Sequence, residues 1–367
     1  MKEIPAMTME NSPKKRLALF FDGTWNKRST RTNVSRLYDL TDADQSYRGK
    51  LGRRSVPEGS TNVDVRQIKF YHPGVGVKWG EKVRGGAFGF GISRNIKDGY
   101  LWLAEHFRPG DEIFVFGFSR GAYTARSLVG LIRKCGIPAF PDEAFAKEAY
   151  HIYREKQWEP DGRQAAAFRE SFSWPDAKVK FVGVWDTVGA LGVPAHGVWF
   201  SKDFYKWHDT DLSRIVENAY HALALDEHRP DFEATLWSNR KVPDKFQSVE
   251  QRWFPGAHGD VGGGEAGRLA QAPLKWMQDK AKACGLIFKH DVIVEKDAHL
   301  DRMTNSYGKF FYGLYAILPW NYPNFRPLHF GVNESIDESV YERQRSPEGM
   351  NEHAKKYDPP ALKFLKG

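Results

Sequence analysis

The sequence feature that most constrains the fold is the segment from residue 112 to residue 132. An apolar, β-rich run leads into Gly-Phe-Ser-Arg-Gly at 117–121, and apolar residues then recur at helical spacing. This pattern predicts a strand, a sharp turn and a helix. In a G-x-S-x-G turn the serine takes a strained backbone conformation, and the two glycines avoid collisions with the strand and the helix. We therefore expect the hydroxyl of Ser119 to stand above the sheet edge as a candidate nucleophile.

Backbone N–H groups near this turn are candidates for holding an oxyanion. The N–H of Arg120 would lie at a helix N-terminus, where the partial positive charge favours an anion. A second strand, residues 17–21, is followed by a turn that contains Gly23 and Thr24. Ligands of open α/β sheets gather at the carboxyl ends of strands, so the N–H groups of Gly23 and Thr24 are further candidates. The alternative is that Asp22 and Gly23 form only a tight turn.

Two more strands are each followed by a residue that could complete a catalytic set with Ser119. One buried strand ends at Asp186, and a later strand, residues 249–254, runs into a glycine-rich loop that contains His258. Taken alone, an acid in the position of Asp186 more often only caps the following turn, and a histidine in the position of His258 is more often a surface group. Asp260, two residues from His258, is a rival acid. The chain order serine, acid, histidine is that of α/β-hydrolases and favours a catalytic triad.

The rest of the pattern alternates between strands and helices. Strands are predicted at residues 17–21, 67–71, 112–118, 178–185 and 249–254, the last being the final clear strand. Helices are predicted at residues 32–40, 93–107, 142–156, 162–171 and 269–284 and directly after the serine turn, with a polar loop to about residue 64. The pattern predicts an α/β fold with a mostly parallel central sheet, helices on both faces, and helical or loop cap insertions.

Two further motifs invite a functional interpretation. His221 and His228 are seven residues apart, on one face if the segment is helical. A metal site would need ligands four residues apart and a third ligand, so a structural or supporting role is favoured. The glycine cluster at 85–91 lacks the lysine of a P-loop and the G-x-G-x-x-G spacing, which favours a mobile loop with exposed Phe88 and Phe90 over a nucleotide site. We expect neither a metal nor an organic cofactor.

Composition limits the classes of function. The net charge of +8 is spread over 54 basic and 46 acidic residues, which indicates only a mild preference for anionic partners. We expect contact with an anionic membrane surface rather than with nucleic acid. Cys135 and Cys284 are far apart in the sequence and indicate core thiols. No apolar run is long enough for a membrane span or a signal peptide, so we expect a soluble protein that is cytoplasmic as made.

Two further segments, one at the N-terminus and one at 310–320, have a distinctive composition. Residues 1–13 are polar and punctuated by proline, which predicts a loose tail before a single domain at 14–367. Residues 310–320 are densely aromatic. Such a cluster contributes to the core by default, and the alternatives are an acyl pocket or a contact with a membrane interface.

The chain resembles a family of uncharacterised α/β-hydrolases whose best-known members are the Tle1-type phospholipase effectors of type VI secretion. The resemblance runs in family order across residues 17 to about 360. It implies a serine esterase acting on lipid, with Ser119, Asp186 and His258 as the triad, and it makes type VI export a possibility. The matching motifs are FDGTWN at 21–26, TNV at 32–34, PGVG at 73–76, GFSRGAYTAR at 117–126, GVWDTVG at 183–189, ALALDE at 222–227 and WFPGAHGDVGGG at 253–264.

Together these observations predict a carboxylic-ester hydrolase of the lipase or phospholipase A type. In this scheme His258 accepts the proton of Ser119, Asp186 orients the imidazole, and the hydrolase needs no cofactor. Two alternatives stay open. One is a catalytically silent module that binds lipid or protein through its aromatic residues, and the other is a peptidase or acyltransferase that uses the same triad.

Overall fold

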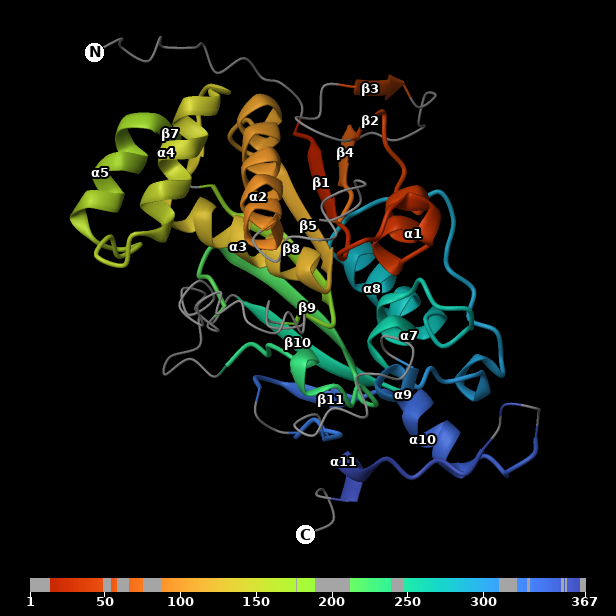
Figure 1. Cartoon of the computed structure of the whole chain (residues 1–367). Helices are drawn as coiled ribbons and strands as arrows, with labels where there is room; N and C mark the ends of the chain where they lie inside the picture. The colour runs from red at the N-terminus through yellow and green to blue at the C-terminus, as the bar shows by residue number, and fades with distance from the viewer. Residues whose placement is uncertain are drawn as a thin grey trace.

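A nine-stranded sheet forms the centre of the molecule (Figure 1). The computed structural model describes residues 14–48, 54–57, 66–74, 87–175, 177–188, 212–238, 247–309, 322–328, 331–350, 353 and 355–363. The strands are β1 (Arg16–Phe21), β2 (Gln45–Arg48), β3 (Arg54–Pro57), β4 (Gln67–His72), β5 (Glu112–Phe118), β8 (Val179–Trp185), β9 (Val216–Ala224), β10 (Ser248–Phe254) and β11 (Glu334–Ile336). Their order in the sheet is β11-β10-β9-β8-β5-β1-β4-β2-β3.

Neighbouring strands from β11 to β2 pair in parallel, and β3 pairs antiparallel with β2 at one edge. The carboxyl ends of β1, β5, β8, β9 and β10 consequently meet along one edge of the sheet. This is the edge where ligands of such sheets bind. The predicted strands at 17–21, 67–71, 112–118, 178–185 and 249–254 are all present in the structure.

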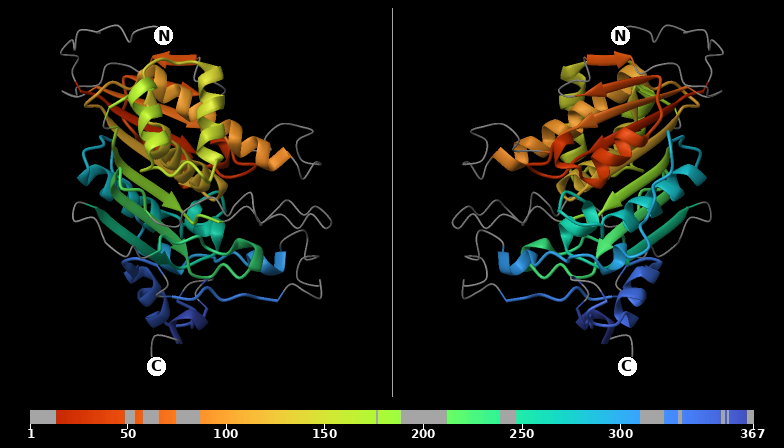
Figure 2. Two further views of the ribbon diagram at one scale, coloured as in Figure 1. Left: turned by 90° about the vertical axis from the view of Figure 1, so that its left-hand side faces the viewer. Right: turned by 90° about the vertical axis from the view of Figure 1, so that its right-hand side faces the viewer.

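Helices cover both faces of the sheet (Figure 2). Alternate residues of β1 show why: Leu17, Leu19 and Phe21 pack into one core, whereas Ala18 and Phe20 pack into the other. The first core is closed by α2 (Ala87–His106) and α3 (Arg120–Cys135), and the second by α1 (Asn33–Leu40) and α8 (Gln271–Ala283). The predicted fold class, a mostly parallel sheet of α/β-hydrolase type with helices on both faces, is confirmed.

Smaller elements lie around this frame. The predicted helices at 142–156 and 162–171 are present as α4 (Glu143–Arg154) and α5 (Arg163–Phe172), and a short ribbon of β6 (Ile137–Pro138) and β7 (Ser173–Trp174) joins their ends. A third core packs α10 (Glu338–Arg345) and α11 (Pro360–Lys363) against β10 and β11. The short helices α7 (His258–Gly262) and α9 (Ser306–Lys309) follow β10 and α8 along the chain.

Several predicted boundaries are wrong. The polar stretch to residue 64 contains β2 and β3, since an edge hairpin can form without an apolar alternation. Helix α2 begins at Ala87, so the glycines at 89 and 91, which the prediction assigns to a loop, are helical. The final strand is β11, not the strand at 249–254, because three residues suffice for pairing once β10 provides an edge. His221 lies on strand β9 rather than on a helix, since a short apolar run does not distinguish a buried strand from a helix.

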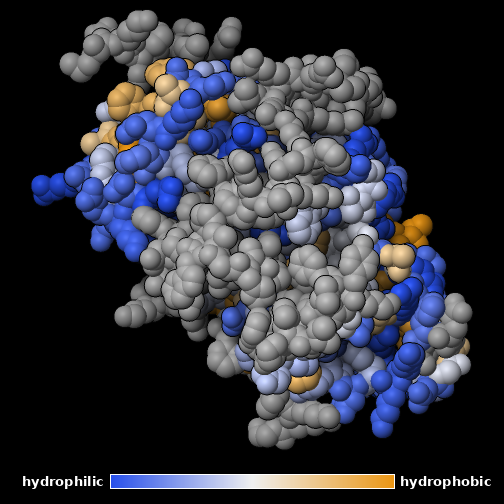
Figure 3. Space-filling view, viewed as in Figure 1, coloured by the Kyte–Doolittle hydropathy of each residue, from blue (hydrophilic) through white to orange (hydrophobic). Residues whose placement is uncertain are grey.

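Three expectations fall outside the described residues: the tail at 1–13, the aromatic run at 310–320 and the side chains of Phe88 and Phe90. On the face drawn in Figure 3, the coloured surface is mainly hydrophilic and the apolar residues form small separate patches. Within the described ranges, none of the helices combines the length and the apolar character that crossing a bilayer requires.

Candidate active site

Ser119 lies in the turn between β5 and α3 with a backbone φ of 57° and ψ of −124°. A side chain on Gly117 would place its Cβ 2.4 Å from the carbonyl oxygen of Gly121, and one on Gly121 would lie 2.1 Å from that of Phe21. Both distances are far below van der Waals contact, so only glycine fits these positions. The predicted nucleophile turn is therefore present, and it packs directly against the end of β1.

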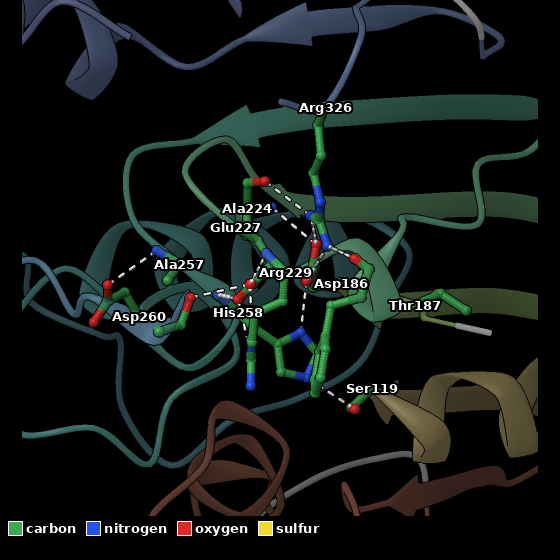
Figure 4. A network of polar contacts seen from close by, with 12 residues as sticks. Ser119, Asp186, Thr187, Ala224, Glu227, Arg229, Ala257, His258, Asp260 and Arg326 are labelled. Carbon is green, nitrogen blue, oxygen red and sulfur yellow. Dashed lines mark hydrogen bonds and ion pairs between the residues drawn. The ribbon is translucent and has the colours of Figure 1, made fainter. Parts of the chain in front are cut away.

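The structure brings Ser119, His258 and Asp186 into one chain of hydrogen bonds (Figure 4). His258 Nε2 lies 2.8 Å from Ser119 Oγ, and His258 Nδ1 lies 2.6 Å from Asp186 Oδ2. The carboxylate accepts from Nδ1–H, which leaves Nε2 to accept the serine proton. All three side chains are buried. His258 is the first residue of α7 rather than part of an open loop, so the helix fixes its position.

Asp186 is held by the backbone of the neighbouring strand. Asp186 has a positive φ of 39°, and its backbone N–H donates to Ala222 O at 2.7 Å. Its Oδ1 accepts from Ala224 N at 3.0 Å. The end of β9 thereby fixes the carboxylate that follows β8, which leaves Oδ2 for His258.

Arg326 also binds this carboxylate, and no motif in the sequence points to it. Its Nη1 lies 2.5 Å from Asp186 Oδ1 and its Nη2 lies 3.0 Å from Asp186 Oδ2. Arg326 belongs to a segment, residues 322–328, that contains two prolines and has no strand or helix periodicity, so no local signal marks it. Burial alone would raise the pKa of Asp186, but the charge of Arg326 and the contact with His258 outweigh it and hold that pKa well below its usual range.

The pKa of His258 is lowered from 6.5 because burial disfavours the imidazolium, and the contact with Asp186 only partly opposes this. Two rings pack against the imidazole. The ring centroid of Phe118 lies 4.6 Å from that of His258, and the ring centroid of Phe232 lies 5.1 Å away. The resting imidazole is therefore neutral near pH 7, the state in which it can accept a proton.

Asp260, the rival acid, points away from the imidazole. Its Oδ2 accepts from Ala257 N at 2.9 Å, and its two oxygens also accept from the N–H and hydroxyl of Thr304. These bonds cap α7 and tie it to the segment before α9. Asp260 therefore supports the helix that carries His258 and does not contact the ring.

Glu227 is a second buried acid at the site, and its position in the sequence does not predict a role for it. Its Oε2 accepts from the backbone N–H of His258 at 3.2 Å. Arg229 forms a two-point ion pair with it, with Nε 2.8 Å from Oε1 and Nη2 2.9 Å from Oε2. Burial would raise the pKa of Glu227, but Arg229 outweighs it and lowers that pKa to about 2. Through the bond from His258 N, the ion pair helps to fix the N-terminus of α7.

The turn after β1 is ordered by Asp22. This buried carboxylate accepts from Thr32 Oγ1, from Tyr71 OH at 2.6 Å and from Gly23 N at 2.8 Å. Burial raises the pKa of Asp22 to about 6. The N–H of Gly23, one of the candidate oxyanion donors, is thus engaged by Asp22. Thr24 Oγ1 is buried with no hydrogen-bond partner in the described structure, and the guanidinium carbon of Arg120 lies 5.6 Å from the ring centroid of Trp25.

His221 supports the acid turn, in agreement with a structural role. Its Nε2 accepts from Thr187 N at 3.0 Å, and its Nδ1 donates to Gln251 Oε1 at 3.3 Å. Burial lowers the pKa of His221 to about 3, so the ring is neutral. Among the described residues, no group of three or more histidine, cysteine, aspartate or glutamate side chains is arranged to hold a metal ion. Cys135 is buried, and Cys284 is half-buried; both are free thiols.

Residues 15–280 match the sequence profile of the family described as "T6SS, Phospholipase effector Tle1-like, catalytic domain". The chain belongs to this family. A relative in Saccharomyces cerevisiae, the uncharacterized protein YEL023C, is 29% identical over 266 residues, which cover 65% of this chain and 35% of the yeast protein. This Tle1-like domain thus spans about a third of the length of that relative.

Two solved structures resemble the Tle1-like domain at low identity. One is an uncharacterized protein from Pseudomonas aeruginosa, with 17% identity, a TM-score of 0.45, and coverage of 75% of this chain and 46% of that one. The other is the Tle1 effector bound to the VgrG spike from the type VI secretion system, with 17% identity, a TM-score of 0.37, and coverage of 75% and 58%.

The matched region of the Tle1-like domain contains Ser119, Asp186 and His258, but it ends before Arg326. The predicted family is therefore confirmed. The segment that supplies Arg326 to Asp186 lies outside the part of the chain on which the family assignment rests.

Proposed function

We propose that this chain is a serine hydrolase of carboxylic esters, with Ser119 as nucleophile, His258 as general base and acid, and Asp186 as the orienting carboxylate. The observation that carries the proposal is the continuous hydrogen-bonded path from Ser119 Oγ through both nitrogens of His258 to Asp186 Oδ2. Such a path supplies the nucleophile, the general base and the orienting acid that acyl transfer through a serine needs.

The reaction has two halves. In the first, Ser119 Oγ attacks the ester carbonyl carbon while His258 Nε2 takes the hydroxyl proton. His258 then gives that proton to the oxygen of the departing alcohol, which leaves an acyl group on Ser119. In the second half a water attacks the acyl carbon and gives its proton to His258, which returns it to Ser119 Oγ as the carboxylic acid leaves. Asp186 stabilises the imidazolium in both halves.

The oxyanion would be held between α3 and the turn after β1. The N–H of Arg120 is the first donor, since it follows the nucleophile at the N-terminus of a 16-residue helix. Thr24 provides the second, from its N–H, its otherwise unpartnered hydroxyl, or both. Gly121 packs against Phe21 O and Asp22 O, so the turn that carries Thr24 adjoins the nucleophile. We place Gly23 in support of this turn, because Asp22 accepts its N–H.

The substrate class follows from the family rather than from the pocket. A Tle1-like phospholipase domain favours a long-chain lipid ester or a glycerophospholipid as substrate. The net charge of +8 adds a modest, salt-sensitive attraction to anionic lipid surfaces. Export by type VI secretion is part of the same proposal, because the family is described as one of type VI effectors.

The test is labelling by a fluorophosphonate, which reacts only with an activated serine, followed by hydrolysis of esters of increasing acyl length and of glycerophospholipids. The wild type should be labelled and should hydrolyse phospholipid faster above its aggregation threshold than below. Ser119→Ala should remove labelling and lower turnover by about 10⁶-fold. If the wild type is not labelled, the alternative of a catalytically silent binding module is favoured. If it is labelled but hydrolyses no ester, the alternative of a peptidase or acyltransferase is favoured.

A further inference from the structure

Arg326 is almost completely buried, with 3% of the residue exposed. Each terminal nitrogen of its guanidinium binds one Asp186 oxygen and one backbone carbonyl. Nη1 donates to Asp186 Oδ1 at 2.5 Å and to Ala224 O at 2.8 Å. Nη2 donates to Asp186 Oδ2 at 3.0 Å and to Phe232 O at 2.5 Å. The geometry is that of a planar arginine that fixes both oxygens of a carboxylate (Figure 4).

The pairing with Arg326 supplies a positive charge that the buried carboxylate of Asp186 requires to stay ionised. Asp186 is completely buried, and the imidazole beside it is neutral at rest, so His258 offers hydrogen bonding but no positive charge. A buried carboxylate without a counter-charge would tend to take up a proton. A protonated Asp186 could neither stabilise the imidazolium nor keep Oδ2 as the acceptor for Nδ1–H. Arg326 is the cation that lies on this carboxylate.

We propose that Arg326 is a positioning residue of the reaction, which keeps Asp186 ionised and holds its Oδ2 toward His258 Nδ1. The inference rests on the proposed serine-hydrolase function. Arg326 does not reach the nucleophile. Its four hydrogen bonds run to Asp186, to the end of β9 and to the loop after it, so its effect passes through the carboxylate.

The segment that carries Arg326 is anchored on both sides of it. Asn324 N donates to His228 O at 2.8 Å, and the ring centroids of Phe325 and His228 are 5.0 Å apart. Leu328 packs into the third core with β10 and α10. A part of the chain beyond the matched catalytic region thereby completes the acid of the candidate triad. Removal of this segment should impair the chemistry even where the fold of residues 15–280 persists.

The expected signature is a change in the pH profile. In the part of the chain that the structure describes, the charged and titratable groups around Asp186 and His258 include Arg326, the Glu227–Arg229 pair and His221. Arg126 acts on His221, and His228 lies near Arg326 and Glu227. Loss of Arg326 leaves Asp186 either ionised, which raises the pKa of His258 through an unshared negative charge, or more easily protonated. Both routes move the acid limb of kcat/KM to higher pH. A structural role alone would lower the amount of folded enzyme and leave the midpoint of that limb in place.

The experiment compares Arg326→Gln, Arg326→Lys, Asp186→Asn and the double variant Arg326→Gln/Asp186→Asn with the wild type. Arg343→Gln is the matched control, because Arg343 is also buried and donates to the backbone carbonyls of His299 and Asp301, away from the triad. Each folded protein is titrated with a fluorophosphonate to count active sites, and kcat/KM per site is measured from pH 4.5 to 9.

We expect Arg326→Gln to lower kcat/KM by roughly 10- to 100-fold at pH 7, as for residues that orient a functional side chain through hydrogen bonds. Its acid limb should move up by about one pH unit or more. Arg326→Lys should recover part of both effects. In the double variant the arginine change should cost nothing beyond Asp186→Asn, since both act through one carboxylate. The acid limb of kcat/KM should stay at the wild-type pH in Arg343→Gln.

Two results would overturn the proposal and leave the serine-hydrolase function intact. One is an acid limb that does not shift in Arg326→Gln, and the other is a loss of kcat/KM on changing Arg326 to Gln that is equal in the wild-type and Asp186→Asn backgrounds. Failure of that function would show differently, as a wild type that is neither labelled nor active. If Arg326→Gln does not fold, Arg326→Lys supplies the pH profile. The double variant, in which no buried charge is left unpaired, is then compared with Asp186→Asn, and a loss of kcat/KM beyond that of Asp186→Asn would overturn the proposal.

Discussion

Ser119 Oγ and His258 Nε2 are 2.8 Å apart although 139 residues separate the two in the sequence. The contact arises because β5 and β10, which precede them, run parallel in one sheet with β8 and β9 between them. Their carboxyl ends therefore open onto the same edge. The acid that follows β8 reaches the imidazole from between them, at 2.6 Å from Nδ1.

Asp186→Asn should lower kcat by about 10⁴-fold, because an amide at this position favours the wrong imidazole tautomer. Asp260→Asn should have a much smaller effect on kcat, since Asp260 caps α7 and binds Thr304 without contacting the ring. The measurement is steady-state hydrolysis of a soluble short-chain ester by both purified variants. A nearly normal Asp186→Asn enzyme beside an inactive Asp260→Asn enzyme would reverse the assignment of the acid.

The pH profile of kcat/KM should report His258. Burial lowers the pKa of His258 from 6.5, and only the neutral ring accepts a proton from Ser119. Activity should therefore rise with pH through a midpoint below 6.5 and be level between pH 7 and 8. The profile is measured on a soluble ester, so that aggregation of lipid does not enter. A midpoint at or above pH 7 would contradict the burial of the imidazole.

Thr24→Val removes a hydroxyl while keeping the shape of the side chain. If that hydroxyl stabilises the oxyanion, kcat should fall by about 10²- to 10³-fold with little change in KM. Thr24→Ser, which keeps the hydroxyl, is the control and should stay near the wild-type rate. The two variants are compared by kcat and by their affinity for a boronic acid that mimics the tetrahedral intermediate. Equal values for Thr24→Val and the wild type would limit the role of Thr24 to its backbone.

Asp226 should make folding stability depend on pH. This buried carboxylate accepts from Gly256 N at 2.7 Å and from Tyr357 OH at 2.8 Å, and burial raises its pKa from 3.8 to about 6. The folded state therefore holds a proton that the unfolded state releases between pH 4 and 6, so the free energy of unfolding falls as the pH rises through that window. Asp226→Asn removes this contribution. The free energy of unfolding of Asp226→Asn relative to the wild type should therefore be up to about 3 kcal/mol more favourable at pH 7.5 than at pH 4.

The measurement for Asp226 is urea unfolding of the wild type and Asp226→Asn at the two pH values. Asp279→Asn, on the exposed face of α8, is the control, because it removes only a surface ion pair with Lys275. The stability difference between that control and the wild type should barely change with pH. A difference for Asp226→Asn that is the same at both pH values would show that Asp226 stays ionised in the folded protein.

Most of the framework of the site could be predicted from local patterns. The turn around Ser119 follows from steric requirements at Gly117 and Gly121, which act within a few residues. The buried strands before Asp186 and His258 are recognisable as short apolar runs, and parallel strands of one sheet end at a common edge. Residue types and their chain order were therefore enough to predict which side chains would meet.

Only the tertiary structure decided which groups surround those side chains. Arg326 reaches Asp186 from 140 residues away, and Glu227 reaches the N–H of His258 from another strand end, with no periodic pattern to mark either. The segment around His221 is too short and apolar for its period to distinguish a helix from a strand, and pairing with β8 on one side and β10 on the other makes it strand β9. Steric requirements and hydrophobic periodicity depend on neighbouring residues, so they can be recognised in the sequence. The partner of a buried charge depends on which distant segments the folded sheet brings together.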